Sequence, residues 1–213
     1  SVGSDVAGRV EAIGSAVTRF KVGDAVFGAA KGSFAEYATA SEDDLAPMPP
    51  NVTFEQAAAS PMAALTALQT LRDTCKLQAG QRVLVCGAAG GVGTFVVQMA
   101  KSMGAHVSAV CSTRNIDMVR SLGADHVIDY TKEDFTKNGE RYDAIIGVNG
   151  YHSLGDYKRS LTPRGIFACA GGTMPQIFET LLFGRLFSEK GGRTLTRTMN
   201  PDRQYTGPDG KEF

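Results

Sequence analysis

The sequence predicts an α/β protein with a doubly wound parallel sheet of about six strands, preceded by part of a small β-barrel. From residue 81 onward, short apolar segments alternate with helix-like segments, which is the rhythm of a parallel sheet covered on both faces. A glycine-rich loop at residues 87–93 follows the first of these strands and precedes the first helix. The first fifty residues, in contrast, contain short segments of alternating apolar and polar residues that are separated by glycines.

Six strands, the number that a full dinucleotide-binding sheet requires, can be located one by one. They are expected at residues 83–86, 106–111, 126–128, 144–148, 166–170 and 194–199. Helices are expected between them at residues 93–103, 116–122, 154–161 and 175–187. Residues 200–213 have many turn formers and no apolar periodicity, so we expect a loop or tail there.

The N-terminal part has a different composition. Its predicted strands are residues 6–13, 24–27 and 34–39. Prolines then end this pattern, and an alanine-rich run follows at residues 54–71. We expect a domain junction near residue 52, with Thr53 as the cap of a helix and Gln56 completing a capping box. The chain would then consist of residues 1–52, residues 53–199 and the tail 200–213.

Composition and charge exclude several classes of function. Lys and Arg number 22, and so do Asp and Glu, so the formal net charge is zero and no basic surface for nucleic acid or an anionic membrane is expected. No stretch reaches the roughly 18 to 20 apolar residues of a spanning helix, and no signal peptide is recognised. We therefore expect a cytoplasmic protein. The four cysteines are far apart and are expected to be buried free thiols.

The loop GAAGGVG at residues 87–93 is the strongest local signal. Glycines at such a place allow a tight turn, close approach of the backbone to a pyrophosphate, and close packing of helix on strand. The helix N-terminus then offers free N–H groups to the phosphates. A strict GxGxxG is absent, because Ala88 occupies the first glycine position of the frame that ends with Gly90 and Gly93. A glycine-rich turn without a ligand remains the alternative.

Short-chain dehydrogenases form a competing interpretation of the same loop, through Gly87, Gly91 and Gly93. Their acid/base chemistry needs a Tyr and a Lys four residues apart on one helix face. None of the six tyrosines has a Lys at that spacing. About eighty residues also precede the loop here, whereas short-chain enzymes usually begin with the nucleotide-binding strand.

Cofactor preference depends on the residues that follow the second strand. NAD-specific folds usually place a carboxylate there, which binds the ribose hydroxyls and would repel a 2′-phosphate. This chain has Ser112, Thr113 and Arg114 instead, and these hydroxyl and guanidinium groups favour NADPH. Tyr130, just after the third strand, is a candidate to flank the adenosine. A solvated loop arginine and a tyrosine with a packing role are the alternatives.

Several ordered segments resemble the medium-chain dehydrogenase/reductase family. GSDVAGRVEAIGSAVTRFKVGDAVFG resembles its GroES-like catalytic domain, and ASPMAALTALQTLRD resembles its domain-joining helix. GQRVLVCGAAGGVGTFVVQMAKSMGAHVSAVCSTRN and SLGADHVIDY resemble the Rossmann NADPH-binding domain of the quinone-oxidoreductase branch. The resemblance extends from residue 3 to about residue 199.

The resemblance implies that a hydride passes from NADPH to a quinone, an enone or a similar activated double bond, in a cleft between two domains. The residues it implies for the cofactor are Thr66, Ala89, Gly90, Gly91, Val92, Gly93, Ser112, Arg114, Tyr130 and Asn149. Of these, Asn149 would approach the nicotinamide ribose and Thr66 the nicotinamide. A helix hydroxyl bonded to its own backbone and a turn asparagine are the alternatives for these two residues.

The expected enzyme is zinc-free. Zinc-dependent relatives carry Gly-His-Glu where this chain has Gly3, Ser4 and Asp5, and they also carry four closely spaced cysteines. The three histidines lie on or near strands of the nucleotide-binding part, where structural roles are expected. Without a Lewis acid to polarise an alcohol, an activated acceptor is the better-supported substrate.

Relatives of this family extend further at both ends, so we expect a partial chain and name no catalytic residue. A non-catalytic NADPH-binding module or partner subunit is the alternative function, and an NAD(P)-dependent alcohol dehydrogenase is a weaker one. The sixth strand resembles the edge through which relatives form homodimers, so a homodimer is expected there.

Overall fold

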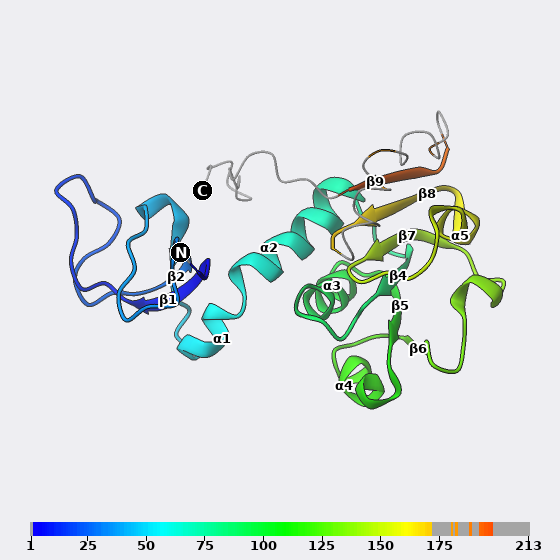
Figure 1. Cartoon of the computed structure of the whole chain (residues 1–213), viewed down its shortest axis with the longest axis horizontal. Coiled ribbons are helices and arrows are strands. Elements are labelled where there is room, and N and C mark those ends of the chain that lie inside the picture. The colour runs from blue at the N-terminus through cyan, green and yellow to red at the C-terminus, as the bar shows by residue number, and fades with distance from the viewer. Residues whose placement is uncertain (1, 172–179, 181, 183–187, 189–191, 198–213) are drawn as a thin grey trace. The chain divides into compact units, whose positions relative to one another are not determined.

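The computed structural model describes residues 2–171, 180, 182, 188 and 192–197 (Figure 1). These residues form two compact units, one ending at Leu65 and the other beginning at Thr66. The sequence placed a domain junction near residue 52 instead. The two positions differ because the first helix, α1 (Phe54–Ala58), packs against the N-terminal sheet.

The N-terminal unit contains a three-stranded antiparallel sheet. Its strands are β1 (Asp5–Arg9), β2 (Ala25–Ala29) and β3 (Leu45–Pro47), in the order β1-β2-β3, with a 3-10 turn at Glu42–Asp44. The predicted capping box is confirmed at the start of α1. The Thr53 backbone N–H donates to the Gln56 side chain at 3.0 Å, and the Gln56 backbone N–H donates to the Thr53 hydroxyl at 3.3 Å.

The strand that we expected at residues 34–39 is wrong. Residues 34–37 form bends and residues 38–39 have no regular structure. Phe34 and Tyr37 are 82% and 74% exposed, so alternation of apolar residues does not correspond to a buried face here. The third strand is β3, which ends in Pro47. A proline is tolerated there because an edge strand has one side on which a backbone N–H is not needed for pairing.

The alanine-rich run forms two helices rather than one. Ala59 and Ser60 separate α1 from α2 (Pro61–Gln69), and α2 continues into a π-helical turn, Thr70–Thr74. Pro61 is the first residue of α2, a position at which the missing N–H costs no hydrogen bond. The second unit begins within α2.

All six strands of the predicted sheet are present in the second unit. They are β4 (Arg82–Cys86), β5 (His106–Cys111), β6 (His126–Asp129), β7 (Tyr142–Gly147), β8 (Leu161–Cys169) and β9 (Thr194–Arg197). Every neighbouring pair is parallel, and the order is β6-β5-β4-β7-β8-β9. The helix expected at residues 175–187 and the tail at 200–213 lie outside the described residues, apart from residues 180 and 182.

Helices cover both faces of this sheet, as the doubly wound prediction requires (Figure 1). The helices are α3 (Gly91–Ser102), α4 (Ile116–Ser121) and α5 (Leu154–Ser160). Val83 and Val85 of β4 pack in one core with α3 and α4, whereas the alternate residue Leu84 packs in the other core with α5. Period-two alternation of side chains explains this division. None of the described helices is long and apolar enough to cross a membrane.

The strand order reverses between β4 and β7. The strand after β4 lies on one side of it, and β7 lies on the other. The connections at the carboxyl ends of these two strands therefore diverge to opposite faces and leave a crevice between them, which is where open α/β sheets bind ligands.

Candidate nucleotide-binding site

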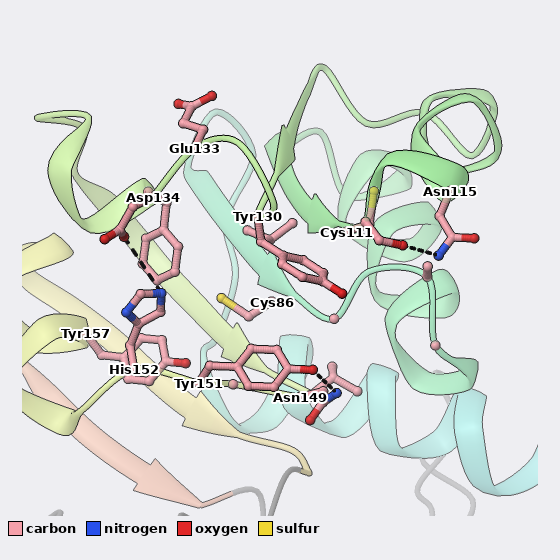
Figure 2. A pocket seen from close by; sticks show the side chains of 18 of the residues that line it. Cys86, Cys111, Asn115, Tyr130, Glu133, Asp134, Asn149, Tyr151, His152 and Tyr157 are labelled. Carbon is pink, nitrogen blue, oxygen red and sulfur yellow. Dashed lines mark hydrogen bonds and ion pairs between the residues drawn. The ribbon is translucent and has the colours of Figure 1, made fainter.

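A pocket of about 650 Å³ opens at the carboxyl ends of the parallel strands (Figure 2). Four strand ends contribute to its wall: Gly87 after β4, Ser112 after β5, Tyr130 after β6 and Asn149 after β7. The backbone joins two of these ends directly, because the N–H groups of Val148 and Asn149 both donate to the Cys86 carbonyl, at 3.0 and 3.2 Å. The pocket therefore lies at the reversal of strand order.

Glycines of the loop allow the chain to turn where side chains would collide. Gly87 has a φ of +87°, and a Cβ there would lie 2.9 Å from the Asn149 backbone nitrogen. A Cβ on Gly93 would lie 2.2 Å from the Gly87 carbonyl oxygen. Ala88, where the strict motif has glycine, is fully buried, so the loop accepts this one methyl group. The motif departs from the strict pattern without losing the close packing of helix on strand.

The loop ends at the N-terminus of a 12-residue helix, α3, whose cap residue is Gly90. The first N–H groups of a helix have no partner within it, and the helix dipole adds positive potential at this end. Gly91 and Val92 supply the first two of these groups. Because Gly90 has no side chain, nothing from the cap fills the space beside them. The arrangement fits a pyrophosphate.

The end of β5 carries the groups that the sequence assigned to a 2′-phosphate. Ser112 and Arg114 both line the pocket. The Asn115 side-chain amide donates to the Ser112 hydroxyl oxygen at 3.1 Å and orients it. Arg114 is exposed and forms no ion pair with any of the described residues, so its cation is available to an anion in the pocket.

A carboxylate lies close behind these groups, at the end of β6. Asp129 is buried and stands opposite Cys111 in the β5–β6 register. The Thr113 hydroxyl donates to it at 2.5 Å, and the Thr131 hydroxyl and backbone N–H donate at 2.8 and 3.0 Å. These hydrogen bonds, that from Thr113 first, lower the pKa of the Asp129 carboxyl to about 2. Asp129 does not line the pocket.

Two tyrosines face each other across the pocket (Figure 2). The ring centroids of Tyr130 and Tyr151 are 6.0 Å apart and the planes are inclined by 44°. The Asn149 side-chain amide donates to the Tyr151 hydroxyl at 3.0 Å. The sequence predicted Tyr130 and Asn149 as site residues but not Tyr151, whose position after β7 was its only signal.

A polar and aromatic group, which the sequence did not predict either, forms another part of the wall. His152 Nε2 lies 3.8 Å from Asp134 Oδ1, and the His152 ring meets Phe135 edge-on at 4.7 Å. The Thr136 hydroxyl and, to a smaller extent, Lys137 and His152 lower the pKa of the Asp134 carboxyl to about 2. These residues follow β6 and β7, so the rule that ligands bind at carboxyl ends identifies their segments but not their side chains.

Six of the predicted site residues line the pocket, namely Ala89, Gly90, Ser112, Arg114, Tyr130 and Asn149. Gly91, Val92 and Gly93 form the first turn of α3, directly after this wall. Thr66 is half-buried within α2 and does not line the pocket. The role expected for Thr66 at the nicotinamide stays a prediction.

The thiols and candidate metal ligands do not provide an alternative chemistry at this site. All four cysteines are free and buried, and burial raises the pKa of the Cys86 thiol, in the pocket wall, to about 12. Such a thiol is not a nucleophile at neutral pH. Within the part of the chain that the structure describes, no group of three or more His, Cys, Asp or Glu residues is arranged to hold a metal ion.

Family models match both parts of the chain. The model described as an alcohol dehydrogenase GroES-like domain matches residues 1–50, and that described as a zinc-binding dehydrogenase matches residues 91–203. The first covers the three-stranded sheet, and the second begins at α3 and includes β5 to β9.

Similar proteins include oxidoreductases of quinones and alkenals. A chloroplast envelope quinone oxidoreductase homolog of Arabidopsis thaliana is 42% identical over 95% of this chain and 57% of its own length. An NADPH-dependent alkenal/one oxidoreductase, chloroplastic, of the same plant is 42% identical over 70% of this chain and 41% of its own. The solved Escherichia coli quinone oxidoreductase complexed with NADPH has a TM-score of 0.72 and 29% identity, covering 81% of this chain and 57% of its own. The chain thus spans about half the length of these relatives.

The close approach of α3 to the loop predicts a matched pair of glycine variants. Gly93→Ala places a Cβ against the Gly87 carbonyl, so we expect urea unfolding of the ligand-free protein to show a loss of about 2 kcal/mol or more. Gly91→Ala adds a Cβ with nothing within 4 Å, so its stability should match the parent within about 0.5 kcal/mol. Equal stability of the two variants would contradict the packing described for Gly93.

The hydrogen bonds to Asp129 predict a dependence of stability on acidic pH. Its pKa is about 2 in the folded chain and 3.8 ordinarily, so its contribution is complete above pH 3.8 and is lost as the pH falls toward 2. Asp129→Asn removes this titration, so the free energy of unfolding should fall less steeply than in the parent between pH 5 and 2. Urea denaturation at a series of pH values measures the slope. The slope should flatten further in Asp129→Asn/Asp134→Asn, because Asp134 has the same shift.

Proposed function

The chain belongs to the quinone-oxidoreductase-like branch of the medium-chain dehydrogenase/reductase family, and on that premise we propose that it binds NADPH and reduces a quinone or an α,β-unsaturated carbonyl without zinc. One observation carries the proposal. A single pocket joins the loop before the N-terminus of α3 to Ser112 and an uncommitted Arg114, at the reversal of strand order. We assign these two ends to the pyrophosphate and the 2′-phosphate of NADPH.

The pyrophosphate would bind at the glycine loop. Free N–H groups at the start of α3 stabilise its charge, and Gly90 lets it approach the backbone closely. The 2′-phosphate would bind the Ser112 hydroxyl and the Arg114 guanidinium, whose bonds to phosphate are charge-assisted. Tyr130 and Tyr151 would lie beside the adenosine, which connects the pyrophosphate to the 2′-phosphate.

A bound nicotinamide supplies the hydride, and the protein supplies position and electrostatics. Anchoring both phosphates fixes the cofactor, which converts hydride transfer into a reaction between held partners. Asn149, at the end of β7, is the candidate to orient the nicotinamide ribose, because its amide is held by Tyr151 and lies in the pocket wall. No proton donor is assigned.

An activated acceptor agrees with the residues at the start of the chain. Ser4 and Asp5 stand where zinc-dependent relatives carry histidine and glutamate, and Asp5 already accepts a hydrogen bond from the Met62 backbone N–H at 2.9 Å. Quinones and enones become anionic during reduction and need hydrogen-bond donors rather than a Lewis acid. The names of the two plant relatives, which refer to quinones and to alkenals and enones, support this class.

A non-catalytic NADPH-binding module or partner subunit is the second candidate. It uses the same cofactor site, because the groups assigned to the pyrophosphate and the 2′-phosphate bind NADPH whether or not a hydride is transferred. Association through β9 stays a prediction, as that strand forms an edge of the described sheet. The cytoplasmic location also stays a prediction, since two of the relatives are named for the chloroplast.

A turnover assay separates these functions. We expect NADPH absorbance at 340 nm to fall when a quinone or an enone is added, with no effect of a zinc chelator and no stoichiometric zinc by elemental analysis. Tight NADPH binding without turnover against a panel of both acceptor classes would instead support the binding module. Stoichiometric zinc with oxidation of an alcohol would revive the alcohol dehydrogenase alternative.

The position of Arg114 in the pocket predicts a preference for NADPH over NADH. Arg114→Ala removes a charge-assisted bond to the 2′-phosphate, so the dissociation constant for NADPH should rise about tenfold or more while that for NADH changes little. Fluorescence titration with each cofactor measures both constants. Arg120→Ala is the matched control, because Arg120 is an exposed arginine of α4 whose partner is Asp117. An unchanged preference in Arg114→Ala would refute the 2′-phosphate assignment.

A further inference from the structure

Three groups of the proposed NADPH site alternate along the chain with three residues that face elsewhere. Thr113 lies between Ser112 and Arg114, and Asp129 and Thr131 lie on either side of Tyr130. Ser112, Arg114 and Tyr130 line the pocket, whereas Thr113, Asp129 and Thr131 do not. Hydrogen bonds among the three residues outside the pocket therefore fix the backbone of their neighbours, which line the pocket.

Thr113, Asp129 and Thr131 form a closed hydrogen-bonded cluster between two strand ends, which we call the threonine–aspartate cluster. Both hydroxyls donate to the Asp129 carboxylate, at 2.5 Å from Thr113 and 2.8 Å from Thr131, and the two hydroxyl oxygens are 3.2 Å apart. The backbone closes the same junction, because the Tyr130 N–H donates to the Cys111 carbonyl at 3.1 Å. The loop after β5 is thus tied to the turn after β6 at a buried carboxylate.

From this arrangement we propose that the threonine–aspartate cluster selects for the 2′-phosphate, with Thr113 and Asp129 as positioning residues that act through Ser112 and Arg114. The inference rests on the proposed function, and it adds the residues that set the cofactor preference. The cluster would act in two ways, by fixing the geometry of the loop that carries Arg114 and by satisfying the negative charge of Asp129.

The geometric part concerns the 3-10 turn Thr113–Asn115, which carries Arg114. Within the turn, the Asn115 backbone N–H donates to the Ser112 carbonyl at 2.9 Å and the Asn115 amide donates to the Ser112 hydroxyl at 3.1 Å. The bond from Thr113 to Asp129 also holds the turn to the neighbouring strand. A long, exposed arginine loses entropy when it binds a phosphate, and a fixed turn reduces that cost.

The electrostatic part concerns the negative charge of Asp129. A carboxylate without hydrogen-bond donors at the end of the β5–β6 pair would repel a 2′-phosphate, or would bind Arg114 in place of that phosphate. The two hydroxyls, the Thr131 N–H and the Lys132 ammonium, at 3.5 Å, satisfy this carboxylate away from the pocket. Removing the Thr113 hydroxyl leaves Asp129 Oδ2 with the longer contact to the Lys132 ammonium, at 3.5 Å, and gives Arg114 a competing anion.

The test compares two ligands that differ only in the 2′-phosphate, namely 2′,5′-ADP and 5′-AMP, by isothermal titration calorimetry. The parent protein should bind 2′,5′-ADP at least tenfold more tightly than 5′-AMP. Thr113→Val should reduce this ratio about tenfold with little change for 5′-AMP, because the hydroxyl is lost at constant side-chain size. Thr113→Ser keeps the hydroxyl and should restore the ratio to within about twofold of the parent. Each expected change is of the size of a lost charge-assisted bond.

The chain offers a control in another threonine–aspartate pair. The Thr162 hydroxyl donates to Asp143 at 3.1 Å, and neither residue lines the pocket. Thr131→Val should lower the ratio and Thr162→Val should leave it unchanged. Thr131→Val also keeps the inference testable if Thr113→Val does not fold, which urea unfolding would reveal.

The outcomes separate the inference from the function on which it rests. A parent protein that binds both ligands equally would overturn the proposed cofactor preference and this inference together. If the parent prefers 2′,5′-ADP and both valine variants keep that preference, the cluster has no selective role and the proposed function stands. An equal loss of affinity for both ligands in these variants would show a structural role only, and would also overturn the inference.

Discussion

The close approach of helix α3 to the loop before it is the contact on which the candidate site depends. A Cβ at Gly93 would come within 2.2 Å of the Gly87 carbonyl, so only glycine lets the helix begin there. That start point sets the direction of the free N–H groups of α3. Gly87 in turn approaches the Asn149 backbone, which joins the loop to the end of β7. One packing constraint therefore positions the N-terminus of α3, the proposed pyrophosphate site, and the neighbouring wall of the pocket.

Electrostatic features of the site divide into groups that attract a ligand and groups that are kept away from it. The terminus of α3 and the exposed Arg114 provide positive potential at two separate points. Asp129 lies behind Arg114, yet threonine hydroxyls satisfy its carboxylate. The hydroxyls stabilise the carboxylate together with the Lys132 ammonium, at 3.5 Å, so Arg114 is not needed as its partner. The zero net charge of the chain gives no indication of this local separation of charge.

Side chains of the pocket differ in how far the sequence could predict them. Arg114 was identified because the end of the second strand has a known role in every dinucleotide-binding sheet. Tyr151 and His152 follow β7 in a segment without any such rule, and they enter the wall only because Asn149 and Phe135 contact them. The strand expected at residues 34–39 failed for a related reason. Its apolar residues alternate, but no partner strand pairs with them among the described residues, and Phe34 is exposed.

By itself, the sequence determined the parallel six-stranded sheet, the glycine loop and the residue types at the end of β5 that we propose to bind a 2′-phosphate. These features follow from local patterns: apolar runs of strand length, glycines before a helix, and the residue types after a strand. Only the tertiary structure decided which strand ends share one pocket, how α1 joins the N-terminal sheet, and that Asp129 bonds Thr113. The physical reason is that hydrogen bonds between strand ends depend on strand order and register, which pair residues far apart in the sequence.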